Sequence, residues 1–418
     1  MPSSSSDPSP RGLPVATRTR PLVAAAVVVA LAAVVVLGRW YELHRAQPRR
    51  AAEREVLVHV TNGGDRGPGT LREALFIVAT ATGPTTISLE VPLVTLQTAL
   101  PDLVNGRGIR LAGQAADTLI DAHALASGPV FNVSGPGTSI EHVIIRNCPG
   151  AAVLVRSLRF RLTESTVDSC DVGVDVAENA SDTLLDRNHF RNDRIGARFA
   201  AAGRNSTVTH DDFDHDKDAG LWAVRRSLDS HDEPIVIRND RFTEDGAGMV
   251  VGNVPVLAEK NDFVNDHDAA VHIVGAGAVI RGNRIDGGAS MGVVVENARG
   301  AVIDSNEFEG LTAYGVMVRG SSDTLVERNR VHNCGYGLAF VLGDTRNANT
   351  AVDNTIIEPK FNGIDVMGDS PVLRGNQVLR AHALALHVED VQPATGPKVH
   401  SQPFLDGNSF GDGKGRSP

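Results

Sequence analysis

Asn306-Glu-Phe-Glu-Gly-Leu-Thr-Ala-Tyr-Gly-Val-Met-Val318 contains the pattern that decides the fold of this chain. It opens with a polar slot, places a large apolar residue two positions later, and ends in Gly followed by an apolar-x-apolar run. The pattern recurs about every 22 residues from Val143 onward, and a period in this range is typical of stacked coils rather than of one globular core. The slot is filled by Ser165, Asn188, Asp211, Asp240, Asn261, Asn283, Asn306, Asn329, Asn354, Asn376 and Asn408. The apolar position is filled by Val167, Phe190, Phe213, Phe242, Phe263, Ile285, Phe308, Val331, Ile356, Val378 and Phe410.

These features predict an all-β chain folded as a right-handed parallel β-helix of about eleven or twelve coils. Runs such as Gly248-Met-Val-Val alternate with a period of two, which indicates a strand with one buried face. The slot and its apolar partner both point inward, so the Phe side chains stack at the strand spacing of about 4.8 Å. The Asn side chains satisfy one another in a buried ladder. A leucine-rich horseshoe is the alternative at this period, but it needs regular Leu positions that the chain lacks.

The segment before the coils carries a second motif, Gly67-Pro-Gly-Thr-Leu-Arg-Glu-Ala-Leu75. It resembles the opening of secreted β-helix proteins of the pectate lyase-like superfamily, and this resemblance implies a β-helix architecture over roughly residues 56–410. Thr70 and Leu71 are expected to begin a short helix with apolar residues at Leu71, Ala74, Leu75 and Val78. Such a helix would cover the open end of the first coil. The strands that start the solenoid are expected at residues 86–89 and 109–111. The motif carries no catalytic residue.

The amino-acid composition limits the classes of partner that the chain is expected to bind. The net charge of −10 argues against nucleic acid as the main partner. With 22% charged and 42% apolar residues, most of the chain is expected to fold. We expect the chain to divide into a disordered tail (1–20), a membrane anchor (21–38), a linker (39–55), the β-helix with its N-terminal cap (56–410) and a flexible tail (411–418). We expect a monomer.

The anchor prediction rests on Leu22–Leu37, an uninterrupted run of sixteen apolar residues. The run is slightly short for a membrane span and slightly long for a signal-peptide core, so a cleavable signal peptide is the alternative. Arginines flank it on both sides, and more follow it than precede it. Taken literally, that bias would place the large domain in the cytoplasm, but the rule is weak for long translocated domains. We expect a single-pass cell-membrane protein whose large domain is extracytoplasmic.

The three cysteines leave one question open. Cys148 and Cys170 are 22 residues apart, about one coil, and are either a disulfide or two small apolar fillers of a turn column. Cys334 lies several coils away and is expected to be free.

A column of carboxylates follows the polar slot at a distance of five residues, and comprises Asp193, Asp216, Asp245 and Asp266. Stacked near 5 Å apart, each adjacent charged pair would cost roughly 3 kcal/mol at an effective dielectric of about 20. Interleaved cations, a bound metal ion or raised carboxyl pKa values could offset that cost. Because oxygen-rich clusters suit Ca²⁺, we predict these four residues as metal ligands and Ca²⁺ as the cation.

The strand after this column should present an outward row next to the carboxylates. The row comprises Asp175, Arg198, Trp222, Val250, His272, Val294, Met317, Ala339 and Asp365. In the pectate lyase-like superfamily the polysaccharide groove resembles this place, and Trp222 is a candidate platform for stacking a sugar ring. We therefore predict Arg194, Arg198, Trp222 and His272 as substrate-binding residues. We predict His215, Lys217 and His267 as catalytic residues, because a His beside carboxylates, or a Lys, can transfer protons.

Specific enzyme motifs are incomplete. Asp214-His-Asp216 and Asp266-His-Asp268 resemble only part of the Asp-x-His-Asp-like motif of β-helix uronate epimerases, because the intervening Pro is missing. The Arg-x-Pro segment of pectate lyases and the Asn-Thr-Asp and Gly-His-Gly motifs of polygalacturonases are absent. Asp, Asn and Gly are also ordinary turn residues, so the acidic column is alternatively a solvated edge or a structural Ca²⁺ ladder.

Three functions are consistent with the sequence. The first is an extracytoplasmic, membrane-anchored protein that binds an acidic polysaccharide and modifies it by lyase or C5-epimerase chemistry. The second is a non-catalytic surface scaffold that binds a glycan or a protein. The third is an assembly factor for a maturing metalloenzyme, although the Met- or Cys-rich metal set that this would require is missing.

Overall fold

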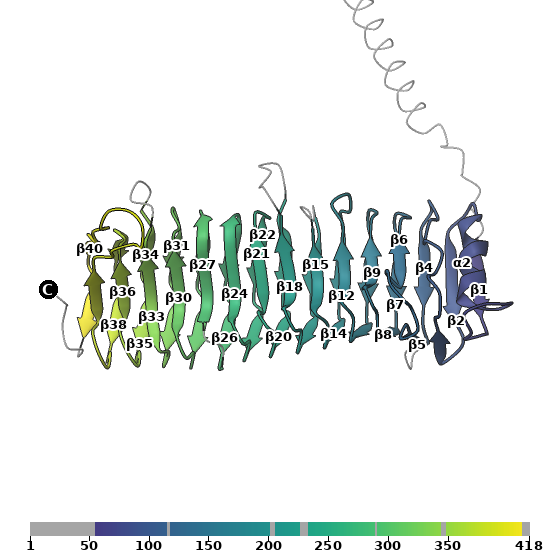
Figure 1. The fold of residues 1–418 in the computed structure, drawn as a ribbon, viewed down its shortest axis with the longest axis horizontal. Coiled ribbons are helices and arrows are strands. Elements are labelled where there is room, and N and C mark those ends of the chain that lie inside the picture. Colours follow the sequence, from purple (N-terminus) through teal and green to yellow (C-terminus); the bar gives the residue numbers. More distant parts are fainter. Residues whose placement is uncertain are drawn as a thin grey trace, which may run out of the picture. The chain divides into compact units, whose positions relative to one another are not determined.

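The computed structural model describes residues 55–114, 118–200, 205–225, 233–288, 291–343 and 348–411. These residues belong to one compact unit, Arg54–Pro418, in which the strands stack side by side from β1 at one end to β40 at the other (Figure 1). The predicted anchor at 21–38, its flanking segments and residues 412–418 lie outside the described part of the chain. Within the described part, no helix is both long enough and apolar enough to cross a membrane.

Three parallel sheets form the walls of the solenoid, and each complete coil adds one strand to each sheet. Sheet 1 comprises β1 (Val56–Val60), β2 (Thr85–Leu89), β4 (Ile109–Ala112), β7 (Ser139–Glu141), β10 (Arg161–Thr163), β13 (Leu184–Asp186), β16 (Thr207–Thr209), β19 (Ile235–Arg238), β22 (Val256–Glu259), β25 (Ala278–Arg281), β28 (Val302–Asp304), β31 (Leu325–Glu327), β34 (Thr350–Val352), β37 (Val372–Arg374) and β40 (Phe404–Asp406). Sheet 2 comprises β3 (Leu93–Thr95), β5 (Thr118–Asp121), β8 (Val143–Arg146), β11 (Thr166–Asp168), β14 (His189–Arg191), β17 (Asp212–Asp214), β20 (Arg241–Thr243), β23 (Asp262–Val264), β26 (Arg284–Asp286), β29 (Glu307–Glu309), β32 (Arg330–His332), β35 (Thr355–Ile357), β38 (Gln377–Leu379) and β41 (Ser409–Gly411). Sheet 3 comprises β6 (Phe131–Val133), β9 (Ala151–Val155), β12 (Val172–Val176), β15 (Ile195–Phe199), β18 (Ala219–Val224), β21 (Met249–Gly252), β24 (Ala269–Ala276), β27 (Met291–Arg299), β30 (Tyr314–Arg319), β33 (Tyr336–Val341), β36 (Ile364–Met367) and β39 (Leu386–Glu389).

The 12-stranded sheet 3 confirms the predicted number of coils. The predicted start of the solenoid was wrong, because β1 already pairs in parallel with β2. The alternating run Val56–Val60 is therefore the first strand rather than a lead-in to the coils.

The described helix, α2 (Leu71–Ala79), lies between β1 and β2 in the chain. Thr70 is its N-cap and accepts from the backbone N–H of Glu73, while Glu73 Oε2 accepts from the N–H of Gly69 at 2.6 Å. These reciprocal bonds satisfy amide groups that a helix start would otherwise leave unpaired. Leu71, Ala74, Leu75 and Val78 are buried in the same core as the first strands.

The predicted Phe stack is confirmed. The rings of Phe190, Phe213, Phe242 and Phe263 lie nearly parallel, with successive centroids 4.9, 4.8 and 4.8 Å apart. Glycines at or beside the start of several sheet 3 strands make room for this stack. A Cβ on Gly220 would lie 2.8 Å from Phe242 Cδ1 and 2.6 Å from Asp245 Oδ2, so a larger residue there would clash.

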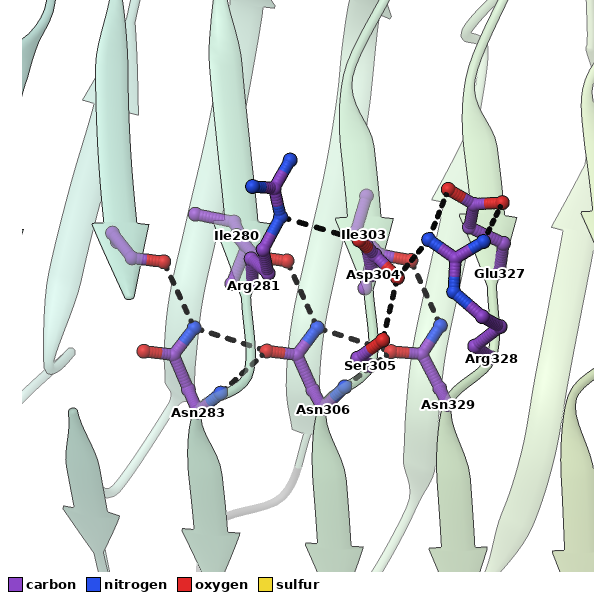
Figure 2. A network of polar contacts seen from close by, with 11 residues as sticks. Ile280, Arg281, Asn283, Ile303, Asp304, Ser305, Asn306, Glu327, Arg328 and Asn329 are labelled. Carbon is purple, nitrogen blue, oxygen red and sulfur yellow. Dashed lines mark hydrogen bonds and ion pairs between the residues drawn. The ribbon is translucent and has the colours of Figure 1, made fainter. Parts of the chain in front are cut away.

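The predicted Asn ladder is also confirmed (Figure 2). Asn306 Oδ1 accepts from both the backbone N–H and the side-chain Nδ2 of Asn283, at 2.9 and 3.0 Å. Asn306 Nδ2 donates to the carbonyl of Ile280 and to Asn329 Oδ1, at 2.9 and 3.0 Å. Each amide therefore serves as donor and acceptor, and the buried turn backbone has no need of water.

Cys148 and Cys170 form a disulfide that joins successive coils, with Cα atoms 4.3 Å apart. This settles the alternative that the sequence left open. Cys334 is free and buried, and burial raises the pKa of its thiol to about 11.

Candidate functional site

The outward row predicted on sheet 3 is present in register. Arg198 pairs with Trp222, Trp222 with Val250, and Val250 with His272 on successive strands. Three residues of this row, Trp222, Val250 and His272, line a pocket of about 590 Å³ on the outer face of β18, β21 and β24. The structure thus assembles part of the predicted binding surface into a concave site.

The floor of the pocket is apolar. Ala219, Ala247 and Val250 are buried, and Trp222 and Val224 pack against them. The indole of Trp222 is half-buried. An aromatic side chain supported from behind in this way presents a rigid surface at little cost in conformational entropy.

The rim of the pocket is charged. Lys217, Asp218, Asp268 and His272 line it. The imidazole of His272 has a buried Nε2 that makes no hydrogen bond to the described residues and lies 3.4 Å from Glu296 Oε2. A polar rim over an apolar floor is the usual composition of a small-molecule or saccharide site.

The two predicted binding arginines are held by carboxylates of the protein. Arg194 donates to Asp171 Oδ1 at 2.7 Å and to Asp218 Oδ2 at 2.8 Å, and these hydrogen bonds raise its pKa. Arg198 makes two hydrogen bonds to Asp175, at 2.9 and 2.6 Å. Their charges are therefore largely neutralised within the protein, and the Arg194 network ends at the pocket through Asp218.

The four predicted metal ligands do not form a site that solvent can reach. Asp193, Asp216, Asp245 and Asp266 point into the solenoid and are at most 1% exposed. In each, Oδ1 accepts the backbone N–H one coil earlier, at 2.7, 2.9, 2.8 and 3.2 Å in turn. Each Oδ2 is buried and has no hydrogen-bond partner among the described residues. The column is therefore a second internal ladder, which continues from the disulfide at Cys170, and not the solvated edge that the sequence left as an alternative.

Burial changes the ionisation of this ladder. Removal from water raises the pKa of Asp245 to about 9 and that of Asp266 to about 8, and it also raises the pKa values of Asp193 and Asp216. Neutral carboxyl groups do not repel one another and are poor ligands for a hard cation. Over the described residues, no group of three or more His, Cys, Asp or Glu side chains is placed to hold a metal ion. Binding of Ca²⁺ by the protein stays a prediction without an assigned site.

The three predicted catalytic residues do not meet in the pocket. Lys217 lines it, whereas His215 and His267 are not among its described lining residues. His215 occupies a left-handed corner, with φ of 59°, and lies 2.8 Å from both Asp214 Oδ1 and Glu244 Oε2. The hydrogen bond with Asp214 raises its pKa. His267 Nδ1 lies 3.0 Å from the carbonyl oxygen of Asp245.

Sequence reasoning did not assign the pocket residues Asp218, Ala247 and Asp268 to the site. Asp218 and Asp268 each follow an inward Asp by two residues, and strict period-two alternation would place both carboxylates of each pair on the same face. The corner before each sheet 3 strand breaks that alternation and exposes the second carboxylate at the pocket rim, so the spacing alone did not predict it. Ala247 has no chemical signal of its own and is recognised only as part of the assembled floor.

Comparison with known proteins identifies the fold family. The family model described as "Right handed beta helix region" matches residues 104–231 and 227–378. No curated protein matches the sequence. Tailspike protein 3 of bacteriophage CBA120 is a similar solved structure, with 15% identity and a TM-score of 0.55 over 84% of this chain. The match spans 61% of the tailspike chain.

Two further solved structures are similar at lower scores. The A-module of the Azotobacter vinelandii mannuronan C-5 epimerase AlgE6 is 16% identical, with a TM-score of 0.47 over 86% of this chain and 99% of its own. PfbA, a surface adhesin of Streptococcus pneumoniae, is 13% identical, with a TM-score of 0.48 over 82% of this chain and 94% of its own. At these identities the likeness is one of fold.

Proposed function

This chain belongs to the right-handed β-helix family, and from the pocket on sheet 3 we infer that it binds a polysaccharide there. The observation that carries the proposal is Trp222, a half-buried indole on the wall of a concave site with a charged rim. A pyranose ring has an apolar face, which suits an indole, and a rim of hydroxyl groups, which suits Lys217, Asp218 and Asp268. The pocket volume of about 590 Å³ lies within the usual range for ligand sites.

The charges of the site favour a neutral stretch of glycan over a uronate. Arg194 and Arg198 already bind carboxylates of the protein, Asp218 among them, so neither arginine is available to a uronate at the rim. A uronate carboxylate entering this site would rely on Lys217 or on a cation that it brings with it. The geometry therefore supports glycan binding more directly than it supports recognition of an acidic sugar.

Catalysis is the second candidate, and His272 favours it. Its imidazole lines the pocket, and its Nε2 is buried 3.4 Å from Glu296 Oε2. A proton from a bound sugar would therefore pass to the other ring nitrogen, Nδ1. Lyase or C5-epimerase chemistry would use His272 or Lys217 as the base that removes the proton α to a uronate carboxylate.

Binding is tested by calorimetry with neutral and uronate oligosaccharides, each with and without Ca²⁺. Trp222→Ala should weaken the affinity for the preferred oligosaccharide by about 1–2 kcal/mol, roughly five- to thirtyfold. Met317→Ala is the matched control, because Met317 lies in the same outward row but not at the pocket. Equal affinities for the two variants, or no heat with any oligosaccharide, would remove the proposal.

Catalysis is tested separately with His272→Gln. This variant should bind the oligosaccharide but release no unsaturated or epimerised product, if the parent protein releases one. If the parent protein binds the oligosaccharide without forming a product, the result supports a non-catalytic, glycan-binding scaffold.

We further propose an extracytoplasmic location, with residues 22–37 as the anchor. The disulfide between Cys148 and Cys170 supports this proposal, because such bonds persist mainly in oxidising compartments. Deletion of residues 1–50 should release a folded, soluble domain, because the first strand begins at Val56. Recovery of the full chain without detergent and of the truncated chain only as aggregate would contradict the anchor.

A further inference from the structure

Sheet 3 carries a second group of aromatic side chains, several coils away from the Trp222 pocket. Tyr314 on β30, Tyr336 on β33 and Phe361, just before β36, stack with successive ring centroids 4.6 and 4.9 Å apart. Unlike the internal Phe stack, these rings reach solvent, because Tyr314 and Tyr336 are half-buried and Phe361 is 49% exposed. Exposed aromatic groups that the scaffold holds in place are typical of a binding surface.

The Phe361 ring is stacked on one side and open on the other. Phe361 holds the corner position before β36 that the pocket residue Asp218 holds before β18, so both lie on the outward rim of sheet 3. Tyr336 covers one face of the ring. In the next coil the equivalent position holds Ala383, whose N–H donates to the carbonyl of Phe361 at 3.2 Å. A methyl group is too small to cover the other face, which leaves a surface on which a sugar ring can stack.

A polar cluster lies beside the aromatic rings. Asp365 and His387 are cross-strand neighbours on β36 and β39, in the same outward row as Trp222. Asp365 is buried, and its Oδ1 accepts from Asn362 Nδ2 at 2.8 Å and lies 3.1 Å from His387 Nδ1. This contact fixes the orientation of the imidazole. His387 Nε2 lies 3.9 Å from Glu389 Oε2, which is beyond hydrogen-bond range, so it can bond to a ligand.

The hydroxyl group of Tyr314 adds a donor to this cluster. Burial raises the pKa of the Tyr314 phenol to about 12, and the nearby Asp365 and Tyr336 add to the effect. The hydroxyl therefore stays protonated near neutral pH and can donate a hydrogen bond. Together with the neutral imidazole of His387 it provides a donor and an acceptor next to the aromatic surface.

We propose that Tyr314, Tyr336, Phe361, Asp365 and His387 form a second saccharide site, and that one polysaccharide chain lying along the solenoid occupies both this site and the Trp222 pocket. The apolar face of a pyranose would stack on Phe361, and its hydroxyl groups would bond to His387 and to Tyr314. The inference rests on the proposed function, and it adds that the ligand is a polymer rather than a short oligosaccharide.

The spacing of the two sites sets the length of chain that is needed. Six strand spacings of about 4.8 Å separate β18 from β36, which is roughly 29 Å along sheet 3 (Figure 1). A ligand that spans this distance binds the second site intramolecularly, at a high effective concentration. Affinity should therefore rise steeply once an oligosaccharide is long enough to reach from one site to the other.

A peptide or a membrane surface suits this site less well. A peptide that adds to a sheet needs a free strand edge, and both β33 and β36 are paired on each side within sheet 3. An anionic membrane would meet the carboxylates of Asp365 and Glu389. A saccharide needs neither a strand edge nor a positive charge.

Calorimetry of the full-length protein with oligosaccharides of graded length tests the two-site arrangement. Oligosaccharides too short to span the sites should bind with the affinity of the Trp222 pocket. Those that span about 29 Å should bind at least about tenfold more tightly, with one chain per protein. An affinity that does not depend on chain length would overturn the proposal and leave binding at the Trp222 pocket in place.

Variants of the second site provide the matched test. Phe361→Ala and His387→Gln should each weaken the binding of long oligosaccharides by about three- to tenfold, while the affinity for short ones stays at the parental value. Phe404→Ala is the control, because Phe404 is an equally exposed Phe that lies on sheet 1. Variants with parental circular dichroism spectra and parental affinity for long chains would remove the second site.

Nuclear magnetic resonance of the Trp222→Ala variant separates the two sites. Addition of a long oligosaccharide should still shift the imidazole resonances of His387, because the second site does not require the pocket. Unchanged resonances, with tight binding by the parent, would remove the second site alone. Shifts at His387 in a parent whose affinity does not depend on Trp222 would instead remove the proposed function of the pocket.

Discussion

The coils from residue 188 to 268 and those from 283 to 408 share one backbone but fill its interior differently. In the later coils every polar slot is Asn, and each amide both donates and accepts, as Asn306 does. In the earlier coils Asp211 and Asp240 occupy slots. Their Oδ1 atoms accept backbone N–H groups at 2.6 and 2.8 Å, but their Oδ2 atoms are buried and find no hydrogen-bond partner in the part of the chain that the structure describes.

The second ladder strengthens this contrast. Asp193, Asp216, Asp245 and Asp266 all lie in the earlier coils, whereas the same column in the later coils holds residues such as Leu311 and Cys334. The backbone of both regions needs an acceptor at the slot. Only a group that can also donate satisfies the remaining buried oxygens, and a carboxyl can donate only when it is protonated. The earlier coils should therefore be sensitive to pH and the later ones should not.

The apolar cores differ as well. The earlier coils stack four Phe rings, and the later ones stack mostly aliphatic side chains such as Ile285, Val331 and Ile356. Phe242→Ala should destabilise its coil by about 3–5 kcal/mol, because it leaves a ring-sized cavity between two neighbours. Val331→Ala should cost about 2 kcal/mol, because only two methyl groups are lost.

Hydrogen exchange of the strands on either side measures both changes locally, which suits a solenoid that unfolds in parts. The strands next to Phe242 could exchange their amide hydrogens as slowly in the Phe242→Ala variant as in the parent. In that case the Phe stack contributes nothing to stability, and the two regions do not differ in their cores.

Substitution of the slot residue tests the contribution of the two ladders to stability. Asn306→Asp should destabilise the later coils by about 2–4 kcal/mol at pH 7, since it removes the donor to Ile280 and faces acceptor oxygens with a carboxyl. Urea unfolding followed by circular dichroism measures the change. A variant as stable as the parent would show that the slot tolerates acid and amide equally.

The reverse substitution, Asp to Asn, should stabilise the earlier coils. Burial raises the pKa of Asp240 to about 8 in the folded protein. Below about pH 4 both the folded and the unfolded states are protonated, so the full stability is present there. As the pH rises from about 4 to about 8, the unfolded state loses the proton first and stability falls. Asp240→Asn should remove that fall, with a gain of about 1–3 kcal/mol at pH 8 and little change at pH 4.

Denaturant unfolding of the parent and of Asp240→Asn at pH 4, 6 and 8 decides the matter, with the Asn306→Asp variant as the opposite control. If the unfolding free energies of the parent and of Asp240→Asn depend on pH in the same way, a donor must satisfy the buried carboxyl group of Asp240. The two regions would then not differ in their electrostatics.

Local sequence determined the coil repeat, the Phe stack, the Asn ladder and the outward row through Trp222, because inward and outward positions alternate along each strand and recur once per coil. It did not determine which way the Asp residues after the slot point. That direction depends on the left-handed corner at the preceding residue, such as Asn192 or His215, and one residue of slip reverses the face.

Contacts between coils were decided only by the tertiary structure. Arg194 meets Asp171 and Asp218 from neighbouring coils, and Cys148 meets Cys170. The ionisation of the Asp ladder belongs to this class as well. A carboxyl group has an ordinary pKa in any local sequence, and only the packed coils around it remove the water that would hold its charge.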